Sequence, residues 1–500
     1  MGCSMNWKSS ILLLVVIASL SLASCSGLNS TCTTNCTNGT AKVTLTLFDT
    51  PPTGTTVLSF SLPIVGISLT PQSGSPVSVY SPTSVQPTEI TRLQTDSALI
   101  TSGVSVKAGN YTSLNVTIAA TSGIFINSSA STITYTLNGS TTTCQAGAVC
   151  NLPAGAATTV AIPMTLTLNG NQSQWVGINV NLNNAIVSTG GIGVDFTQPN
   201  VFTATTTVRA GLPSGAVDTI EDFTGKVTAL SNSSITVQNA ITGQSLTAGV
   251  VSGTTELAVA PSSYSNCTNA NPATCIAVGS TVSVNANLAA DGTLTATEID
   301  GLDLTATDEI EGVIYPTSAI GVVGLILLDK SSASGNSVLN AAAYGTPFLL
   351  TSTSNSITYN VDSGPLTSAI GTNPPGFSGT GNLLAGQVVR AQVTNVSVVN
   401  NTNQATAVHV LLRWSRLSGS VNLVSGNVVT LTGVPTYITT LNSGFTLTPQ
   451  VNTYPNNSAF DGVSAVSGLT VGNTAAVRAL FVDTAGGSQF PFLAAKVRTP

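Results

Sequence analysis

The chain has 500 residues, of which only 6% are Asp, Glu, Lys or Arg, compared with about 25% in an ordinary soluble protein. Hydrophobic residues make up 42% of the chain, which argues against charge-rich disorder, and the scarcity of Glu, Lys, Arg and Gln argues against a helical protein. A net charge of -6 leaves no basic surface for nucleic acid, so no nucleic-acid partner is expected.

Residues 1–24 have the pattern of an export signal. Lys8 precedes an apolar segment from Ile11 to Leu22, which at about 12 residues is too short to span a bilayer as a helix. The segment runs into Leu22-Ala23-Ser24-Cys25, which resembles a bacterial lipobox. The resemblance implies cleavage before Cys25 and lipidation of its thiol, and two or more acyl chains hold a protein stably on a membrane. Ser26, in place of Asp, favours the outer membrane. The alternative is an ordinary signal peptide with a nearby cysteine.

Six further cysteines of the expected mature chain fall into three local couples. Close, even-numbered cysteines in an exported protein predict disulfides that close small loops. A zinc site would instead require CxxC knuckles with further Cys or His residues nearby, and the sequence has none. We therefore expect no metal or other cofactor at these positions. The couples are Cys32 with Cys36, Cys144 with Cys150, and Cys267 with Cys275.

Residues 25–40 are small and polar, which predicts a flexible tether. From Ala41 onward apolar and polar residues alternate, as at Val43, Leu45 and Leu47, and this period is typical of half-buried antiparallel strands. The pattern recurs between clusters of Gly, Asn, Ser and Pro. We therefore predict an antiparallel β-sandwich over residues 41–205.

Three segments of this region resemble a domain-of-unknown-function family that opens many bacterial lipoproteins. They are LTLFDTP at residues 45–51, ISLTP at 67–71 and VKAGNYT at 106–112. The last of them is also similar to the edge turn of transthyretin-like and carboxypeptidase-regulatory-like sandwiches. Phe48 intrudes before Asp49, and Thr50 stands where alanine is usual. The resemblance implies a fold and a location, and it implies no activity.

After a linker at residues 206–221, three segments open alike. They read FTGKV at 223–227, IEGVI at 310–314 and LSGSV at 417–421. The glycines are 87 and 107 residues apart, which is too long for a solenoid repeat. We predict an all-β protein in which the sandwich is followed by two or three small β-barrel-like units in tandem. Their expected ranges are 222–303, 308–413 and 416–500. The first unit also resembles a family of small secreted β-domains of unknown function.

The chemistry-bearing residues are few. His409, the single histidine, is expected to be a solvated strand residue opposite an apolar face formed by Val408 and Val410. The sequence contains no G-x-S-x-G elbow, no G-x-G-x-x-G and no P-loop, so a serine triad and nucleotide binding lack their usual motifs. We therefore predict that the protein is not an enzyme.

Nine of the 19 acidic residues cluster at the expected junctions between units. We interpret them as solvated, charged linkers that keep neighbouring sheets from pairing edge to edge. The alternative is a calcium site, with Asp300, Asp303 and Asp308 as candidate ligands, because hard cations prefer clustered oxygens. The nine are Asp218, Glu221, Asp222, Glu298, Asp300, Asp303, Asp308, Glu309 and Glu311.

Basic residues concentrate instead near the C-terminus, where six of the 13 lie in the last 111 residues. Acidic junctions and a basic last unit can dock within one molecule or between molecules, and only close contacts would matter at physiological salt. The six are Arg390, Arg413, Arg416, Arg478, Lys496 and Arg498.

Together these features predict a non-enzymatic, lipid-anchored protein of the cell envelope with a binding, adhesive or structural role. Its expected partners are the membrane, through the N-terminal lipid, and an envelope polysaccharide or protein. The alternative is an envelope polysaccharide hydrolase that uses two carboxylates. A metal-dependent binding module is the third hypothesis.

Overall fold

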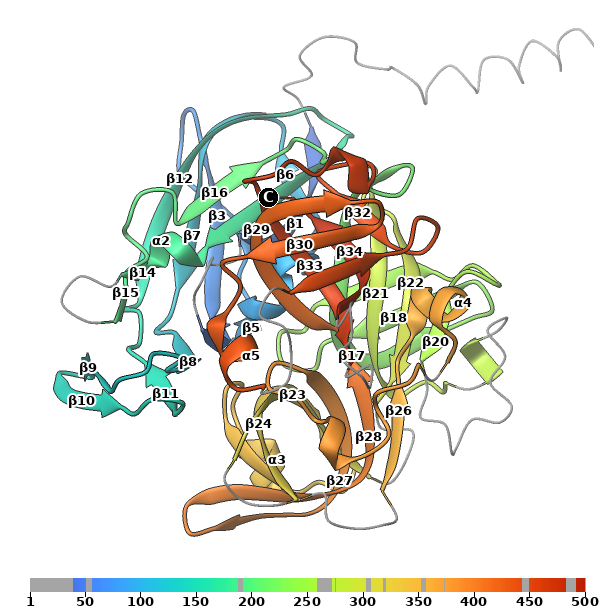
Figure 1. Ribbon diagram of the computed structural model, residues 1–500. Coiled ribbons are helices and arrows are strands. Elements are labelled where there is room, and N and C mark those ends of the chain that lie inside the picture. Colours follow the sequence, from blue (N-terminus) through green and yellow to red (C-terminus); the bar gives the residue numbers. More distant parts are fainter. Residues whose placement is uncertain are drawn as a thin grey trace, which may run out of the picture.

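The computed structural model describes residues 39–50, 56–187, 192–258, 272–274, 276–302, 307–317, 321–351, 357–372, 374–442, 449–482 and 492–499. Within these ranges the chain is all-β, with an N-terminal set of sheets followed by three barrel-like units, as predicted (Figure 1). None of the helices in these ranges is long and apolar enough to cross a membrane.

The N-terminal sandwich contains three four-stranded sheets around one core, with two small ribbons at its margin. Strand β1 lies at its centre and pairs with β13 in parallel and with β6 antiparallel, so the sandwich is mixed rather than wholly antiparallel. The sheets are β16 (Phe202–Thr205), β13 (Ser173–Asn181), β1 (Thr40–Thr50), β6 (Ala98–Lys107); β12 (Thr158–Leu168), β7 (Gly109–Ile118), β3 (Ile64–Pro71), β4 (Val77–Tyr80); and β11 (Val149–Leu152), β8 (Ser122–Ile126), β2 (Val57–Leu62), β5 (Thr88–Glu89). The ribbons are β9 (Ile133–Leu137) with β10 (Ser140–Cys144), and β14 (Ile186–Val187) with β15 (Gly193–Val194); the short helices are η1 (Ile90–Gln94) and α2 (Leu182–Ala185).

The alternation of β1 predicts one buried face, but both faces are buried. Val43, Leu45 and Leu47 point into the sandwich core. On the opposite face Thr44 and Thr46 are also buried, because the first barrel unit covers them. The expectation of half-buried strands is therefore wrong for β1, since local alternation carries no information about a covering module.

The three barrel-like units share one topology. In each, six strands form a sheet in the same order, and an additional parallel pairing between the third and the last strand closes it. Unit 1 comprises β17 (Ala216–Leu230), β18 (Ser234–Gln238), β19 (Ser245–Gly249), β20 (Glu256–Ala258), β21 (Thr281–Ala289) and β22 (Leu294–Gly301), with η2 (Pro272–Thr274). Unit 2 comprises β23 (Asp308–Tyr315), β24 (Val322–Ser331), β25 (Pro347–Thr351), β26 (Thr358–Val361), β27 (Val388–Val399) and β28 (Thr402–Arg413), with α3 (Ser337–Ala341), η3 (Gly364–Leu366), α4 (Thr367–Ile370) and η4 (Thr380–Asn382). Unit 3 comprises β29 (Ser415–Ser425), β30 (Val428–Thr432), β31 (Gln450–Thr453), β32 (Ala459–Asp461), β33 (Thr474–Phe481) and β34 (Phe492–Arg498), with α5 (Thr436–Thr440) and η5 (Val466–Gly468).

The repeated glycine has the same structural cause in all three units. A Cβ atom on Gly312 would lie 2.1 Å from the carbonyl oxygen of Ile326 on the neighbouring strand. Gly225 and Gly419 approach the second strand of their own units in the same way. Glycine therefore permits the close approach of the first two strands, which no larger residue allows.

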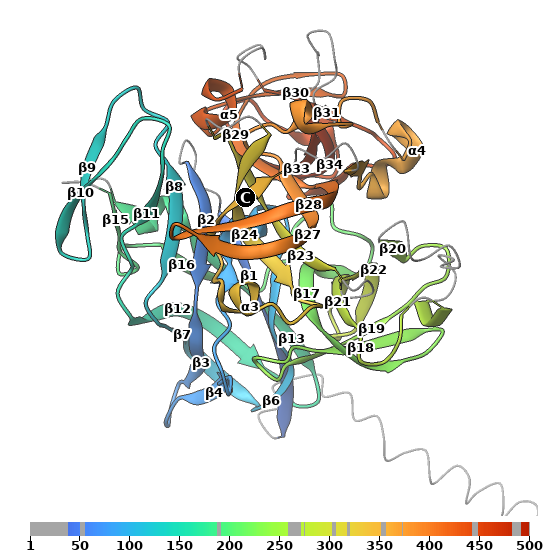
Figure 2. The same cartoon turned by 90° about the horizontal axis from the view of Figure 1, so that it is seen from below.

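The units are grouped against the sandwich and not strung out in a row (Figures 1 and 2). Strand β17 contacts β6, β24 contacts β2, and β29 contacts η1. Backbone hydrogen bonds join the sandwich directly to unit 1, because Ser97 N donates to Thr219 O and Glu221 N donates to Ser97 O, both at 2.9 Å. The junctions between the four modules are therefore interior surfaces.

Candidate functional site

The largest concentration of chemistry-bearing side chains is a network of ion pairs where the four modules meet. It contains all seven arginines of the chain and Lys496, which come from the sandwich, the segment before unit 1, unit 2 and unit 3. We call it the central ion network. Its bases are Arg92, Arg209, Arg390, Arg413, Arg416, Arg478, Lys496 and Arg498, and its acids are Asp96, Asp218, Glu221, Asp222, Glu298, Asp300, Glu311, Asp329, Asp362 and Asp461.

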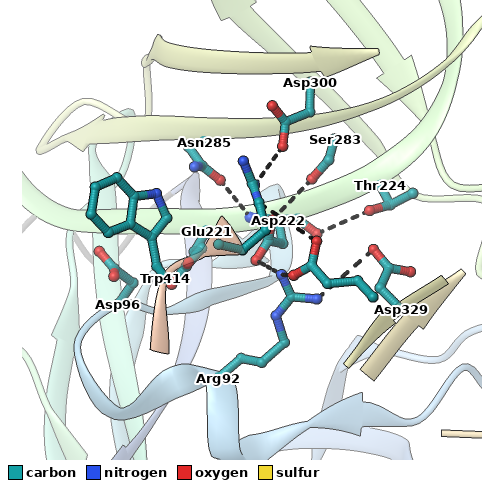
Figure 3. Close-up of polar contacts among 12 residues, drawn as sticks. Arg92, Asp96, Glu221, Asp222, Thr224, Ser283, Asn285, Asp300, Asp329 and Trp414 are labelled. Carbon is teal, nitrogen blue, oxygen red and sulfur yellow. Dashed lines mark hydrogen bonds and ion pairs between the residues drawn. The ribbon is translucent and has the colours of Figure 1, made fainter. Parts of the chain in front are cut away.

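Arg92 joins the sandwich to units 1 and 2. The short helix η1 presents it, and the Glu89 carboxylate caps that helix by accepting from Thr91 N at 3.2 Å. The guanidinium pairs with Asp222 of unit 1 and lies 3.0 Å from Glu311 Oε1 of unit 2 (Figure 3). One arginine thus links three modules.

Arg413 joins unit 2 to unit 1. Its Nη2 atom lies 2.6 Å from Asp300 Oδ2, and its Nη1 atom pairs with Asp362. Arg390 lies 3.1 Å from the same Asp300 oxygen and 2.8 Å from Glu311 Oε2. Two guanidinium groups of unit 2 therefore form ion pairs with Asp300, on the last strand of unit 1.

Unit 3 pairs with both the sandwich and unit 1. Arg416 pairs with Glu221, and Arg478 lies 3.7 Å from the same carboxylate. On the sandwich side, Lys496 Nζ lies 2.8 Å from Asp96 Oδ1 and Arg478 Nη1 lies 3.3 Å from Asp96 Oδ2. The last two strands of the chain therefore contact a carboxylate from its first hundred residues.

A fourth group surrounds the ring of Phe48. Arg209 lies over this ring at 4.9 Å and Arg498 at 4.6 Å, which is the distance range of cation–π contacts. Arg209 also lies 2.8 Å from Asp218 Oδ1 and 2.7 Å from Asp461 Oδ1. The phenylalanine that departs from the expected family pattern thus packs beneath the buried Arg498 and the partly buried Arg209.

Burial and neighbouring charge shift the pKa values of these acids in opposite directions. Burial alone would raise the pKa of Glu311, but Arg92, Arg390 and Arg413 lower it to about 2. Burial raises the pKa of Asp329 to about 6 and that of Glu221 to about 7, because the neighbouring arginines offset the effect of burial only in part. The network therefore combines firmly ionised carboxylates with carboxyls that titrate near neutrality.

A cavity of about 130 Å³ borders the network between the sandwich, unit 1 and unit 2. Glu89, Arg92, Asp222, Asp329 and Tyr344 are among the residues that line it. Ligand pockets usually measure about 300–1,000 Å³, so this cavity suits ordered water or a very small molecule, and it does not suit a sugar chain.

The acidic junctions are not solvated linkers. Eight of the nine acids are described, none of them is exposed, and that prediction is wrong. The physical reason is that β17 already begins at Ala216, so its acids lie on a strand packed against the sandwich and opposite arginines. Of the two docking modes that the charge distribution left open, the intramolecular one is observed.

The proposed calcium ligands are not brought together. Asp300 pairs with Arg390 and Arg413, whereas Asp308 accepts hydrogen bonds from Ser332 and Ser334. Asp303 lies outside the described residues. In the part of the chain that the structure describes, no group of three or more His, Cys, Asp or Glu side chains is arranged to hold a metal ion.

His409 is buried rather than solvated, with 9% of its surface exposed. Its Nε2 atom lies 2.9 Å from Asn360 Oδ1, and burial lowers its pKa. Val408 is exposed while Val410 is buried, so the assumed common apolar face does not exist. The nearby register shift between Gln392 and Val393 disturbs the alternation on which the prediction rested.

Cys144 and Cys150 form the predicted disulfide, with an S–S distance of 2.03 Å. The other cysteine predictions concern residues outside the described ranges: the lipidation site Cys25 and the couples Cys32 with Cys36 and Cys267 with Cys275.

Sequence reasoning missed Arg92, Asp96, Asp329 and Asp362 altogether. Because the chain has so few charged residues, an isolated charge next to an apolar strand is the sequence signal that could have identified these buried residues.

Comparison with known proteins gives a family for one part of the chain. Residues 224–300, which span most of unit 1, match the family model described as Domain of unknown function (DUF5666). This agrees with the expected likeness of the first unit to a β-domain family of unknown function. No curated protein matches the chain. A solved structure titled drosophila Unr CSD456 is 12% identical over 56% of this chain and 97% of that chain, with a TM-score of 0.12.

Proposed function

We propose that this protein is a non-enzymatic, lipid-anchored component of the cell envelope whose four modules form one rigid body that binds or scaffolds through its outer loops. The lipobox-like sequence ending at Cys25 supports the anchor. A body of packed sheets supports the scaffold role, because loops carried on rigid sheets commonly bind partners.

The central ion network is the observation that carries the proposal. Its arginines and carboxylates are engaged with one another between modules, so their evident use is to hold the modules together. By contrast, only four charged side chains in the described ranges are exposed: Lys42, Lys107, Lys226 and Asp291. An exterior with so little charge favours contact with an uncharged partner, such as a neutral polysaccharide, over electrostatic capture.

Fractionation of cells that express the full chain tests the anchor. We expect the wild type in the membrane fraction with a lipid-modified N-terminus, and the Cys25→Ser variant in the soluble fraction or retained with its signal. Protease treatment of intact cells then reports which face is occupied. Recovery of the wild type as soluble, unacylated protein would end the anchored proposal.

A hydrolase is the second candidate, because carboxylates from three modules border the 130 Å³ cavity, but the cavity is too small for a sugar chain. Asp222 and Asp329 are the relevant acids, since burial raises the pKa of Asp329 to about 6 and a carboxyl of that kind can act as a general acid. Both are near Arg92, which speaks against free proton transfer. Incubation of the wild type and of Asp329→Asn with envelope polysaccharides, followed by a reducing-end assay, separates the two functions.

A further inference from the structure

Lys496 and Asp96 form an unusual pair within the central ion network. The Lys496 Nζ atom lies 2.8 Å from Asp96 Oδ1, although the residues are 400 positions apart. Their exposed fractions are 3% and 4%, and Lys496 is the only buried lysine in the described ranges. The pair connects β34, the last strand of unit 3, to the segment between η1 and β6 of the sandwich.

Further polar side chains lie close to the carboxyl group of Asp96. Thr219 Oγ1 accepts from Lys496 Nζ at 2.7 Å and donates to Asp96 Oδ1 at 3.1 Å, so it holds the amine and the carboxyl together. Arg478 Nη1 donates to Asp96 Oδ2 at 3.3 Å. The same Arg478 Nη1 atom lies 3.7 Å from Glu221 Oε1, and Figure 3 shows Asp96, Glu221 and Trp414 in one region.

We propose that Lys496 and Asp96 condense to an intramolecular isopeptide bond, with Glu221 and Arg478 as the groups that activate the carboxyl. The Lys496 amine forms a new C–N bond to Asp96 Cγ, one C–O bond of the carboxyl breaks, and one water leaves. Lysine amine and aspartic acid thus become a secondary amide and water, with no oxidant, reductant or other reactant.

Proton positions determine the order of events. The Asp96 carboxyl is ionised at rest, because Lys496 and Arg478 lower its pKa in spite of its burial. Transfer of one ammonium proton to the carboxylate gives a neutral amine and a neutral acid; burial favours these neutral forms, whereas the neighbouring cations oppose protonation of Asp96. The amine then attacks Cγ. Because this route passes through a minor state, the bond forms slowly and once per molecule.

Glu221 and Arg478 act at the next stage. Attack places negative charge on the carboxyl oxygens, and the Arg478 guanidinium already donates to one of them. The buried Glu221 Oε2 atom, which has no hydrogen-bond partner among the described residues, can supply a proton from the same region. Burial raises the pKa of Glu221 to about 7, so a large share of molecules carries this proton at neutral pH. Glu221 also lines the 130 Å³ cavity, which offers space for the departing water.

Holding the reactants in contact makes the step effectively unimolecular. Effective molarities of about 10⁵–10⁸ M are reached when reacting groups are fixed in this way. The product would tie the last strand of unit 3 to the sandwich by a covalent bond that denaturants and reductants leave intact.

Mass spectrometry of the full chain after disulfide reduction tests the bond. The cross-linked protein is one water lighter than its processed sequence. Trypsin then yields a branched peptide in which residues 93–107 are joined to residues 479–498, and cleavage after Lys496 is lost because its amine is acylated. An unchanged mass together with complete cleavage after Lys496 would show an ion pair only and overturn the proposal.

Two variants separate the covalent bond from the ion pair. Lys496→Arg keeps the positive charge but has no nucleophilic amine, so we expect complete loss of the branched peptide. Lys226→Arg, the same change at an exposed lysine, is the matched control and should retain it. Detection of any branched peptide that contains residues 93–107 in the Lys496→Arg protein would show that another amine reacts with Asp96, and it would refute the assignment.

Glu221→Gln tests the activating proton. This variant keeps the shape of the side chain and loses the transferable proton, so we expect bond formation in newly synthesised protein to slow by about 100-fold, the usual scale for a positioned acid. Circular dichroism checks that the variant has folded. A folded Glu221→Gln protein that cross-links at the wild-type rate would remove Glu221 from the mechanism; if the variant does not fold, the wild-type peptide map alone decides.

Discussion

Glu298 in unit 1 and Lys496 in unit 3 occupy the same position of the barrel repeat. Each lies on the last strand of its unit, opposite Asn285 and Arg478 respectively, which are themselves equivalent residues of the fifth strand. His409, opposite Gln392, is the counterpart in unit 2. One structural position therefore carries an acid, an imidazole ring and a base. Glu298 and Lys496 pair with residues of other modules, whereas His409 contacts Asn360 of its own unit.

Removal of Arg413 is expected to be among the most destabilising single changes in the chain. Arg413→Met leaves the carboxylates of Asp300 and Asp362 buried beside fewer cations, and breaking a buried pair in this way costs about 3–5 kcal/mol. Urea unfolding followed by circular dichroism measures the loss. Lys226→Met, at an exposed position, should change stability by no more than about 0.5 kcal/mol. A loss for Arg413→Met as small as this control would mean that the network contributes little.

Stability should be greatest in mildly acidic solution. The pKa of Glu309 is raised from 4.5 to about 7 in the folded state, so its contribution is present below pH 4.5 and is lost as the pH rises through 7. The pKa of Glu311 is lowered from 4.5 to about 2, so its contribution is present above pH 4.5 and is lost as the pH falls through 2. Asp329, with a pKa of about 6, adds to the loss on the alkaline side.

Urea midpoints measured from pH 3 to pH 8 test this expectation. We expect a maximum near pH 4.5, and Glu309→Gln should flatten the decline between pH 5 and pH 7 because it removes one titrating group. A wild-type profile that rises steadily from pH 5 to pH 8 would contradict the assigned shifts.

The repeated glycine can be tested in the middle barrel. Gly312→Ala places a Cβ atom 2.1 Å from the carbonyl oxygen of Ile326. The strands must move apart to avoid this clash, which lowers the stability of the folded protein by about 1–3 kcal/mol or more. Gly379→Ala is the matched control, because its backbone is extended and a Cβ atom there meets nothing within 4 Å. Differential scanning calorimetry should show a lower Tm for Gly312→Ala alone. Equal Tm values would show that the two strands separate without cost.

Thr46 connects the sandwich to unit 1 by a single hydroxyl. Its Oγ1 atom donates to Asp218 Oδ2 at 2.6 Å and accepts from Trp175 Nε1 at 2.9 Å, and all three side chains are buried. Thr46→Val leaves the indole N–H unsatisfied, at a cost of about 1–3 kcal/mol. Chemical unfolding monitored by tryptophan fluorescence reports the change. Thr117→Val, at an exposed cross-strand pair, should be close to neutral; comparable losses in both variants would argue against a special role for Thr46.

The architecture could be predicted from sequence because its signals are local. Alternation of apolar residues identifies the strands, and the close approach at Gly225, Gly312 and Gly419 requires the same residue three times. The Cys144–Cys150 disulfide could also be predicted from sequence, because the two cysteines are only six residues apart. These features depend on neighbours in the chain.

The candidate site could not be predicted because its partners are distant. Asp96 and Lys496 are separated by 400 residues, and a strand pattern does not reveal which module will cover its outer face. For the same reason the acids of β17 resemble a solvated linker in sequence and are buried in the folded protein. The opposite trends of acidic and basic residues along the chain did indicate docking, but not its geometry.

The distribution of partners along the chain has a consequence for biogenesis. Among the described residues, the cations that form ion pairs with Asp96 and Glu221 all come from the final hundred residues. The central ion network therefore cannot form until synthesis is nearly complete. In a prematurely terminated product, Asp96 and Glu221 lack these ion-pair partners. Such a fragment would fold incompletely and would be degraded by proteases, so the arrangement favours the retention of full-length protein.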